Sequence, residues 1–204
     1  MKRIGILGGS FNPVHLGHLN IARVAADSFQ LDKVLFIPCK VSPFKIGEEP
    51  DRVVGESDRL RMIELTIEAD PRFELSRIEI DRGGISYSFD TVNAVQKYFP
   101  EARLFFIIGS DSLLSLALWH NIDALSNMCE FVTVERPGVN YNDFKTAGLP
   151  AKLIESLSNH RVTGKLLDIS STDVRSKLAD GESITGMVDP AVEQYIADHQ
   201  LYRR

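Results

Sequence analysis

The sequence predicts an α/β protein built on a doubly wound parallel sheet, and three observations lead to this expectation. Short runs rich in Ile, Val, Leu and Phe recur along the chain, as is typical of strands buried on both faces. Helical patterns alternate with these runs, which favours a parallel sheet with right-handed crossovers. The 204 residues, 44% of them hydrophobic, suit one domain with a sizeable core.

Six strands and six helices are expected. The strands are Ile4–Leu7, Val34–Ile37, Phe73–Ile80, Leu104–Ile108, Phe131–Val134 and Val162–Ile169. The helices are Leu16–Phe29, Asp58–Ala69, Thr91–Phe99, Lys152–Leu157, Ser171–Leu178 and Pro190–His199. The fold class is therefore a Rossmann-like doubly wound parallel sheet with helices on both faces. We expect a single domain over residues 1–204, with a C-terminal helical part, about 170–204, packed on the core.

Ligands of such sheets bind at the carboxyl ends of the strands, where the strand order reverses. A glycine turn after Leu7 and the Gly109-Ser110-Asp111 segment after Ile108 both follow expected strands. Two long loops, Pro38–Ser57 and Arg136–Pro150, are also candidates, because long loops in compact domains are often functional.

Composition excludes several classes of protein. The net charge of −5 argues against a general nucleic-acid-binding surface. Cys39 and Cys129 form no CxxC pair, so they indicate free thiols in a reducing compartment, and no acidic or histidine cluster has metal-ligand spacing. The N-terminal apolar run is too short for a signal peptide and no stretch is long enough to span a membrane. The chain is expected to be cytoplasmic.

The segment from Gly8 to His18 carries the most specific chemistry. It reads Gly-Gly-Ser-Phe-Asn-Pro-Val-His-Leu-Gly-His and joins a strand to a helix. The glycines permit a tight turn, and the N–H groups at the helix start favour a phosphate. His15 and His18 share one side of the helix start and could donate hydrogen bonds to that phosphate. A glycine-rich turn with two solvated histidines is the alternative.

A second anion-binding motif lies near the other end of the chain, Ile169-Ser-Ser-Thr-Asp-Val-Arg175. Its hydroxyl residues are good N-caps for a short helix that Gly181 would follow. Arg175, about one turn in, could fork onto phosphate oxygens. A capped helix with a surface arginine is the alternative.

The first motif resembles the GGxFxPxHxGH signature of the HxGH nucleotidyltransferase superfamily. Further segments match the nicotinate-nucleotide adenylyltransferases in order along nearly the whole chain. They are Pro43-Phe-Lys45, Asp58-Arg-Leu-Arg-Met62, Gly83-Gly-Ile-Ser-Tyr-Ser-Phe-Asp-Thr91, Ile108-Gly-Ser-Asp111 with Trp119, Glu135-Arg-Pro137, Ile169–Arg175 and the ending Val192 to Tyr202. Ser88 stands where many relatives have Thr, so the hydroxyl is kept.

This resemblance implies adenylyl transfer from ATP to nicotinate mononucleotide. The implied catalytic residues are His15, His18, Lys45 and Arg175. The implied ATP-binding residues are Gly8, Gly9, Ser10, Phe11, Gly17, Gly109, Asp111, Arg136, Ile169, Ser171 and Thr172. The implied residues for the nicotinate nucleotide are Asn12, Gly84, Ser86, Tyr87, Ser88 and Trp119.

Several of these residues have simpler interpretations, which the sequence leaves open. Asp111 could be the N-cap of a helix beginning at Ser112, and Trp119 could be a core residue. Lys45 and Arg136 could be solvated surface residues. In the implied site, Trp119 stacks on the pyridine ring, and backbone N–H groups between Gly84 and Ser88 hold the nicotinate carboxylate.

The expected partners are ATP and nicotinate mononucleotide, with neither nucleic acid nor membrane, and a homo-oligomer is compatible with the sequence. Mg²⁺ would arrive on the ATP phosphates, without a metal site of the protein's own. Related enzymes that act on phosphopantetheine, a phospho-alcohol or nicotinamide mononucleotide remain alternatives. A non-catalytic nucleotide sensor is less favoured, because both histidines and Arg175 are present. A fragment of a class I aminoacyl-tRNA synthetase is a further alternative, but it would need a Lys-Met-Ser-Lys-Ser-like loop, which this sequence does not contain.

Overall fold

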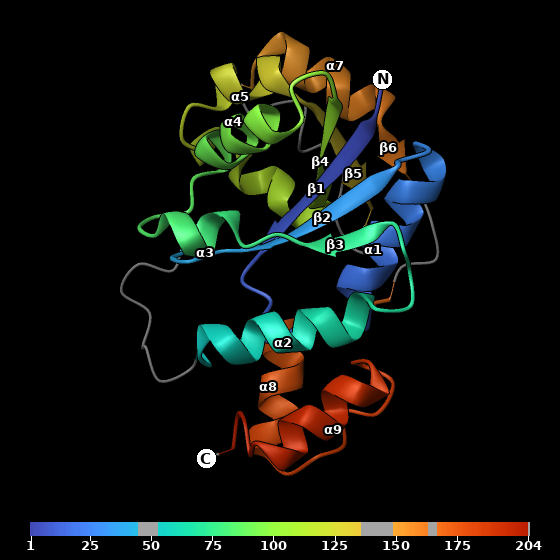
Figure 1. Ribbon diagram of the computed structural model, residues 1–204, viewed down its shortest axis with the longest axis vertical. Coiled ribbons are helices and arrows are strands. Elements are labelled where there is room, and N and C mark those ends of the chain that lie inside the picture. The colour runs from blue at the N-terminus through green and yellow to red at the C-terminus, as the bar shows by residue number, and fades with distance from the viewer. Residues whose placement is uncertain (45–52, 136–148, 163–166, 204) are drawn as a thin grey trace.

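The computed structural model describes residues 1–44, 53–135, 149–162 and 167–203. Its centre is a six-stranded sheet in which each strand is parallel to its neighbours, in the order β3-β2-β1-β4-β5-β6 (Figure 1). The strands are β1 Arg3–Gly9, β2 Lys33–Pro38, β3 Phe73–Leu75, β4 Arg103–Gly109, β5 Glu130–Val134 and β6 Arg161–Val162. This is the Rossmann-like order expected from the sequence.

Helices follow the strands and cover both faces of the sheet. They are α1 Leu16–Ser28, α2 Glu56–Ile67, α3 Ile78–Arg82, α4 Ser88–Tyr98, the 3-10 helix η2 Ser110–Leu118, α5 Ile122–Met128, α7 Ala151–Asn159, α8 Ser171–Ala179 and α9 Pro190–Asp198. None of the helices in the described part of the chain is long and apolar enough to cross a membrane.

Two hydrophobic clusters separate the faces of the sheet because alternate strand side chains point to opposite sides. Phe105 and Ile107 of β4 join the cluster that α1 covers, whereas Phe106 and Ile108 join the one that α4, α5 and α7 cover. The first cluster also takes in residues of α2, α8 and α9, which lie together at one end of the molecule (Figure 1). Here Tyr195 of α9 donates its hydroxyl hydrogen to Asp58 of α2 at 2.9 Å.

The strand order reverses between β1 and β4, which lie side by side in the middle of the sheet. β1 ends at Gly9 and β4 ends at Gly109. Both glycine-bearing segments that the sequence analysis placed at the carboxyl edge therefore lie at the point where such sheets bind ligands.

Two expected strands are much shorter than predicted. Phe73–Ile80 divides into β3, which ends at Leu75, and helix α3, which begins at Ile78. Ile78 and Ile80 alternate with polar residues and so imitate a strand, but pairing ends at Ser76, whose N–H donates to Phe36. Of the expected strand Val162–Ile169, only Val162 lies in β6, and residues 163–166 are outside the described part.

The segment after β4 was predicted least well. Helices η2 and α5 were not expected, and Gly109 rather than Asp111 is the N-cap of η2, so Asp111 lies in its first turn. The expected loop Pro38–Ser57 ends two residues early, since α2 begins at Glu56. Helix α8 begins at the predicted Ser171, with Ser170 as its N-cap, and ends at Ala179, one residue later than predicted; Gly181 follows it with a left-handed φ of 72°.

Candidate active site

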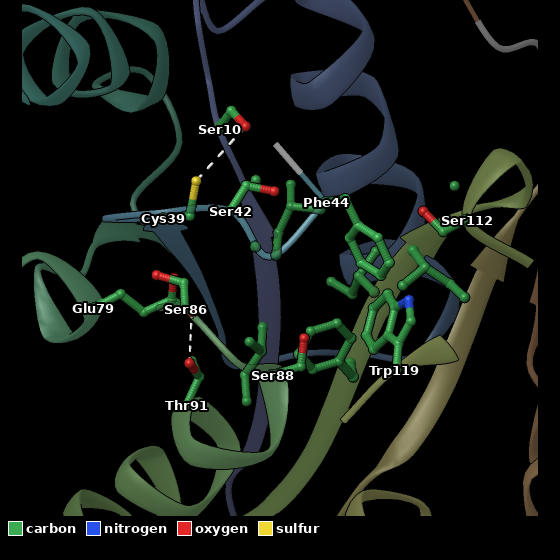
Figure 2. A pocket seen from close by; sticks show the side chains of 18 of the residues that line it. Ser10, Cys39, Ser42, Phe44, Glu79, Ser86, Ser88, Thr91, Ser112 and Trp119 are labelled. Carbon is green, nitrogen blue, oxygen red and sulfur yellow. Dashed lines mark hydrogen bonds between the residues drawn. The ribbon is translucent and has the colours of Figure 1, made fainter. Parts of the chain in front are cut away.

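A cavity of about 280 Å³ opens at the carboxyl ends of β1 and β4. It brings together part of each predicted subsite, and the predicted residues that line it are Gly8, Gly9, Ser10, His18, Ser86, Ser88, Gly109, Asp111 and Trp119. Figure 2 shows Ser10 and Cys39 at one end, Glu79, Ser86 and Thr91 along one side, and Phe44 and Trp119 on the opposite side. The phosphate motif and the proposed pyridine-binding segment thus share one cavity.

The two histidines of the first motif touch each other at the start of α1. His15 is the N-cap and is 2% exposed, and the two ring centroids are 3.7 Å apart. The His15 backbone N–H donates to His18 Nδ1 at 3.3 Å. Because Nδ1 accepts this hydrogen bond, a neutral His18 ring carries its proton on Nε2. His18 lines the cavity, so Nε2–H is the donor that this ring can offer to an anion.

Phe11 supports His18 from the core. Its side chain is 1% exposed, and its ring lies 4.9 Å from the His18 ring and 5.9 Å from that of Phe36. The backbone of Phe11 adopts a left-handed φ of 45°, which is uncommon for a bulky residue. Phe11, expected in the ATP site, therefore has a buried ring that packs behind the histidine.

The second motif docks against the first. Ser170 and Asp173 form a capping box at the start of α8, and the Ser171 hydroxyl donates to the carbonyl of Pro13 at 2.8 Å. Arg175 Nη1 donates to the carbonyl of Asn12 at 2.7 Å. Both of these partners are neutral oxygens, and no ion pair of Arg175 with a carboxylate is found in the described part of the chain. Segments about 160 residues apart thus form one cationic corner.

Thr172 and Ile169 complete this corner. The Thr172 hydroxyl lies 3.4 Å from Arg175 Nη2. The carbonyl of Ile169 lies only 3.2 Å from where a Cβ on Gly17 would be. The glycine of the first motif therefore permits close contact between α1 and the segment leading into α8.

Asn12 has a structural role that the sequence did not reveal. It is 3% exposed, and its Oδ1 accepts hydrogen bonds from the Tyr202 hydroxyl at 2.9 Å and the Val54 N–H at 3.3 Å. Burial raises the pKa of Tyr202, so its hydroxyl stays protonated and can donate. These contacts fasten the phosphate turn to the C-terminal segment; the role expected for Asn12 at the mononucleotide stays a prediction.

Arg59 lies in the family-matching segment Asp58–Met62, but the sequence analysis gave it no role of its own. It is 3% exposed, and Nη1 donates to the carbonyls of Ser10 and Cys39 at 2.8 and 2.9 Å. The guanidinium therefore joins the turn after β1 to the end of β2 and leaves a positive charge next to the cavity. The available signal was an arginine beside Leu60, Met62 and Ile63, on a helix whose apolar residues are buried.

At the other end of the cavity, the protein itself uses two of the N–H groups expected to bind a carboxylate. The Ser86 N–H donates to the Val41 carbonyl at 2.9 Å, and the Tyr87 N–H donates to the Ile85 carbonyl at 3.2 Å. Ser88, the first residue of α4, lines the cavity. The N–H groups of a first helical turn have no partners within the helix.

Gly84 and Tyr87, both expected to bind the nicotinate nucleotide, lie outside the walls of the main cavity. Gly84 is exposed with a left-handed φ of 70°, in the turn between α3 and α4. The Tyr87 ring lies 4.4 Å from that of His120 in a neighbouring hollow, which Trp119 and Phe44 also line. Neither Gly84 nor Tyr87 is among the residues that line the main cavity.

Trp119 is both a packing residue and part of the cavity wall. Its ring meets that of Phe106 edge-on at 5.6 Å, and Nε1 donates to the Ser115 hydroxyl at 3.4 Å. Phe44, 53% exposed, lines the same cavity. Together the two rings give this end of the cavity an aromatic surface on which a flat ring can stack.

Lys45 and Arg136 lie outside the described residues, so their predicted roles are not placed by geometry. In the part of the chain that the structure describes, no group of three or more His, Cys, Asp or Glu side chains could hold a metal ion.

The doubly wound sheet, with a phosphate turn at its switch point and a second helix N-terminus docked on that turn, defines a nucleotide-binding α/β protein. The cytidylyltransferase-like family matches residues 6–177. A probable nicotinate-nucleotide adenylyltransferase of Pelobacter propionicus is 42% identical over 98% of both chains. One of Thermoanaerobacter sp. is 37% identical over 99% of this chain and 95% of its own. The chain belongs to the nicotinate-nucleotide adenylyltransferase family within the cytidylyltransferase-like proteins.

Solved structures agree on the fold. The nicotinic acid mononucleotide adenylyltransferase of Plasmodium falciparum complexed with NaAD superposes with a TM-score of 0.79, at 18% identity, over 99% of this chain and 98% of its own. A putative nicotinate-nucleotide adenylyltransferase of Vibrio parahaemolyticus superposes with a TM-score of 0.70, at 19% identity, over 99% and 96%.

Proposed function

We propose that this protein transfers the adenylyl group of ATP to nicotinate mononucleotide, releasing pyrophosphate and forming deamido-NAD in NAD biosynthesis. The observation that carries the proposal is the single cavity in which the phosphate turn with His18 meets Ser88 and Trp119. Family membership over the full length supports the same activity.

The phosphate end of the cavity suits ATP. Gly8, Gly9 and Ser10 bring the backbone close to the ligand, and His18 donates to the α-phosphate as charge develops on it. Arg175, held by the turn itself, binds the β- and γ-phosphates beside the N–H groups that begin α8. By family resemblance, Lys45 and Arg136 add positive charge from segments outside the described residues. Mg²⁺ arrives on the ATP phosphates and keeps most of its waters.

The reaction needs positioning more than it needs acid–base chemistry. An oxygen of the mononucleotide's 5′-phosphate attacks the α-phosphorus of ATP, and the bond to the pyrophosphate oxygen breaks. A phosphate is already ionised at pH 7, so no side chain has to remove a proton from it. The main barrier is the mutual repulsion of two anions held in line, which His18 and Arg175 offset.

The other end of the cavity suits the pyridine ring. Trp119 and Phe44 provide aromatic surfaces for it, and the first N–H groups of α4 face a carboxylate favourably because of the helix dipole. The segment from Gly84 to Ser88 thereby recognises the acid through backbone donors, with Ser88 nearest the cavity.

Pyrophosphate release tests the function directly. The purified protein with ATP, Mg²⁺ and nicotinate mononucleotide should release pyrophosphate and form one dinucleotide per pyrophosphate. His18→Ala should lower kcat by about 10²–10³-fold, as for loss of one preorganised donor. Loss of the His15 N–H bond should lower the thermal midpoint by only a few degrees, so the activity loss cannot be due to unfolding. His199→Ala, at the exposed end of α9, is the matched control and should retain full activity. Normal turnover by His18→Ala would remove the role proposed for that ring.

A further inference from the structure

Glu79 is the one buried carboxylate in the described part of the chain. It belongs to the short helix α3, is 5% exposed, and lies against the cavity. Burying a carboxylate is unfavourable unless hydrogen bonds compensate it. Burial raises the pKa of Glu79, while hydrogen bonds from Thr91 and Ser86 and the charge of Arg82 oppose that rise. Because burying this carboxylate is unfavourable, we expect it to serve a structural or functional role.

The Glu79 carboxylate joins the two sides of the turn between α3 and α4. Its Oε1 accepts a hydrogen bond from the Thr91 hydroxyl at 2.5 Å, in the first turns of α4 (Figure 2). The Ser86 hydroxyl also lies close enough to the carboxylate to lower the pKa of Glu79. Ser86 Oγ in turn accepts the N–H of Lys40 at 2.9 Å. One side chain therefore fastens the beginning of α4, the preceding loop and the end of β2.

The turn that Glu79 fastens contains two glycines in left-handed conformations. Gly83 and Gly84 have left-handed φ values of 72° and 70°, and no atom lies within 4 Å of where a Cβ on either would be. Gly83 is held by the hydrogen bond of its N–H to the Glu79 carbonyl at 3.1 Å, and the angle at which α4 meets the cavity also depends on contacts further along. Ser86 and Thr91, which flank Ser88, supply those contacts through Glu79.

A direct role for Glu79 in binding the acid is excluded by charge. The carboxylate of Glu79 and the carboxylate of nicotinate would repel each other across the same cavity. Any favourable effect of Glu79 on the acid must therefore come from the geometry it imposes on α4 and must outweigh this repulsion.

We infer that Glu79 is a positioning residue, which holds the start of α4 so that its N–H groups meet the nicotinate carboxylate and thereby sets the preference for the acid over the amide mononucleotide. The inference rests on the proposed function and deepens it. The amide has no anionic group for these N–H groups to bind, so loosening the turn should weaken binding of the acid alone.

Glu79→Gln is the first variant, because Gln keeps the shape but turns one acceptor into a donor. Its kcat/KM for nicotinate mononucleotide should fall about tenfold through KM, the scale of one hydrogen bond to a charged group. The KM for ATP and the kcat/KM for nicotinamide mononucleotide should stay within about twofold. Thr91→Val removes one donor to Glu79 with little change of shape, and should shift the same ratio in the same direction.

Glu74→Gln is the matched control, an exposed carboxylate paired with Lys33 away from the cavity, and should leave the acid-to-amide ratio unchanged. Equal losses for both mononucleotides, or an unchanged ratio in folded Glu79→Gln, would overturn the inference. If Glu79→Gln does not fold, the ratio in Thr91→Val decides in the same way. If the wild-type protein makes no dinucleotide from nicotinate mononucleotide, the proposed function fails instead.

Discussion

Gly17 shows how closely the two phosphate motifs approach each other. A Cβ at this position would lie 2.9 Å from His15 Nδ1 and 3.2 Å from the carbonyl of Ile169. The histidine ring and the backbone before α8 are held by other contacts, so neither can move without cost. Glycine is therefore needed between the two histidines, because a larger residue would collide with His15 and with Ile169 of the second motif.

Gly17→Ala should consequently separate the motifs. Overpacking of this kind costs about 1–3 kcal/mol of unfolding free energy, which urea denaturation measures. Displacement of His15, and of His18 with it, by a fraction of an ångström should lower kcat by about 10²-fold. A Gly17→Ala protein with wild-type stability and turnover would contradict this account of the contact.

Helix α8 is the element that completes the phosphate end of the site. Its capping box was readable from the sequence because Ser170 and Asp173 have the required spacing. Its docking was not, since the bonds from Ser171 and Arg175 go to the carbonyls of Pro13 and Asn12, and backbone acceptors leave no trace in side-chain patterns. The helix was therefore predicted, but its dependence on the first motif was not.

Ser171→Ala tests the docking of α8. Losing one hydrogen bond should lower the unfolding free energy by about 1 kcal/mol, or the melting temperature by about 2–4 °C. The KM for ATP should rise several-fold because Arg175 is less firmly placed, while the KM for the mononucleotide stays unchanged. Ser158→Ala, on the exposed face of α7, is the control. A Ser171→Ala protein with an unaltered KM for ATP would show that the docking bond does not position the arginine.

The remaining elements were likewise predicted where the sequence pattern is local and clear, and missed where it is not. The long elements were recovered because their apolar residues form a clear pattern, a continuous run in β4, which is buried on both faces, and one helical face in α1. Helix α3 was mistaken for a strand and α5 was missed because segments of five and seven residues carry too few repeats to fix a period. The segment η2 was missed because it is a 3-10 helix, whose period of three residues per turn differs from that of an α-helix. The roles of Arg59, Glu79 and Tyr202 were not predicted, because they rest on hydrogen bonds between distant segments, which a local motif does not reveal even where it contains the residue.

At the scale of the whole molecule, the sheet brings the two ends of the chain to one site. The cluster under α1 contains strand residues together with Val174, Val192 and Ile196 of the C-terminal helices. Tyr202 adds a hydrogen bond to Asn12, 190 residues away in sequence. We infer that residues 1–204 form a single domain, because the C-terminal part shares its core with the sheet and contributes to the site.

The central claim is that one cavity joins ATP to the acid form of the mononucleotide. A competition experiment tests it most directly: the protein is given ATP and Mg²⁺ with equal concentrations of nicotinate and nicotinamide mononucleotides, and the dinucleotide products are separated by mass. The account predicts that deamido-NAD forms in large excess over NAD, with one pyrophosphate released per dinucleotide. Predominant NAD, equal amounts of both, or pyrophosphate release without dinucleotide would contradict it.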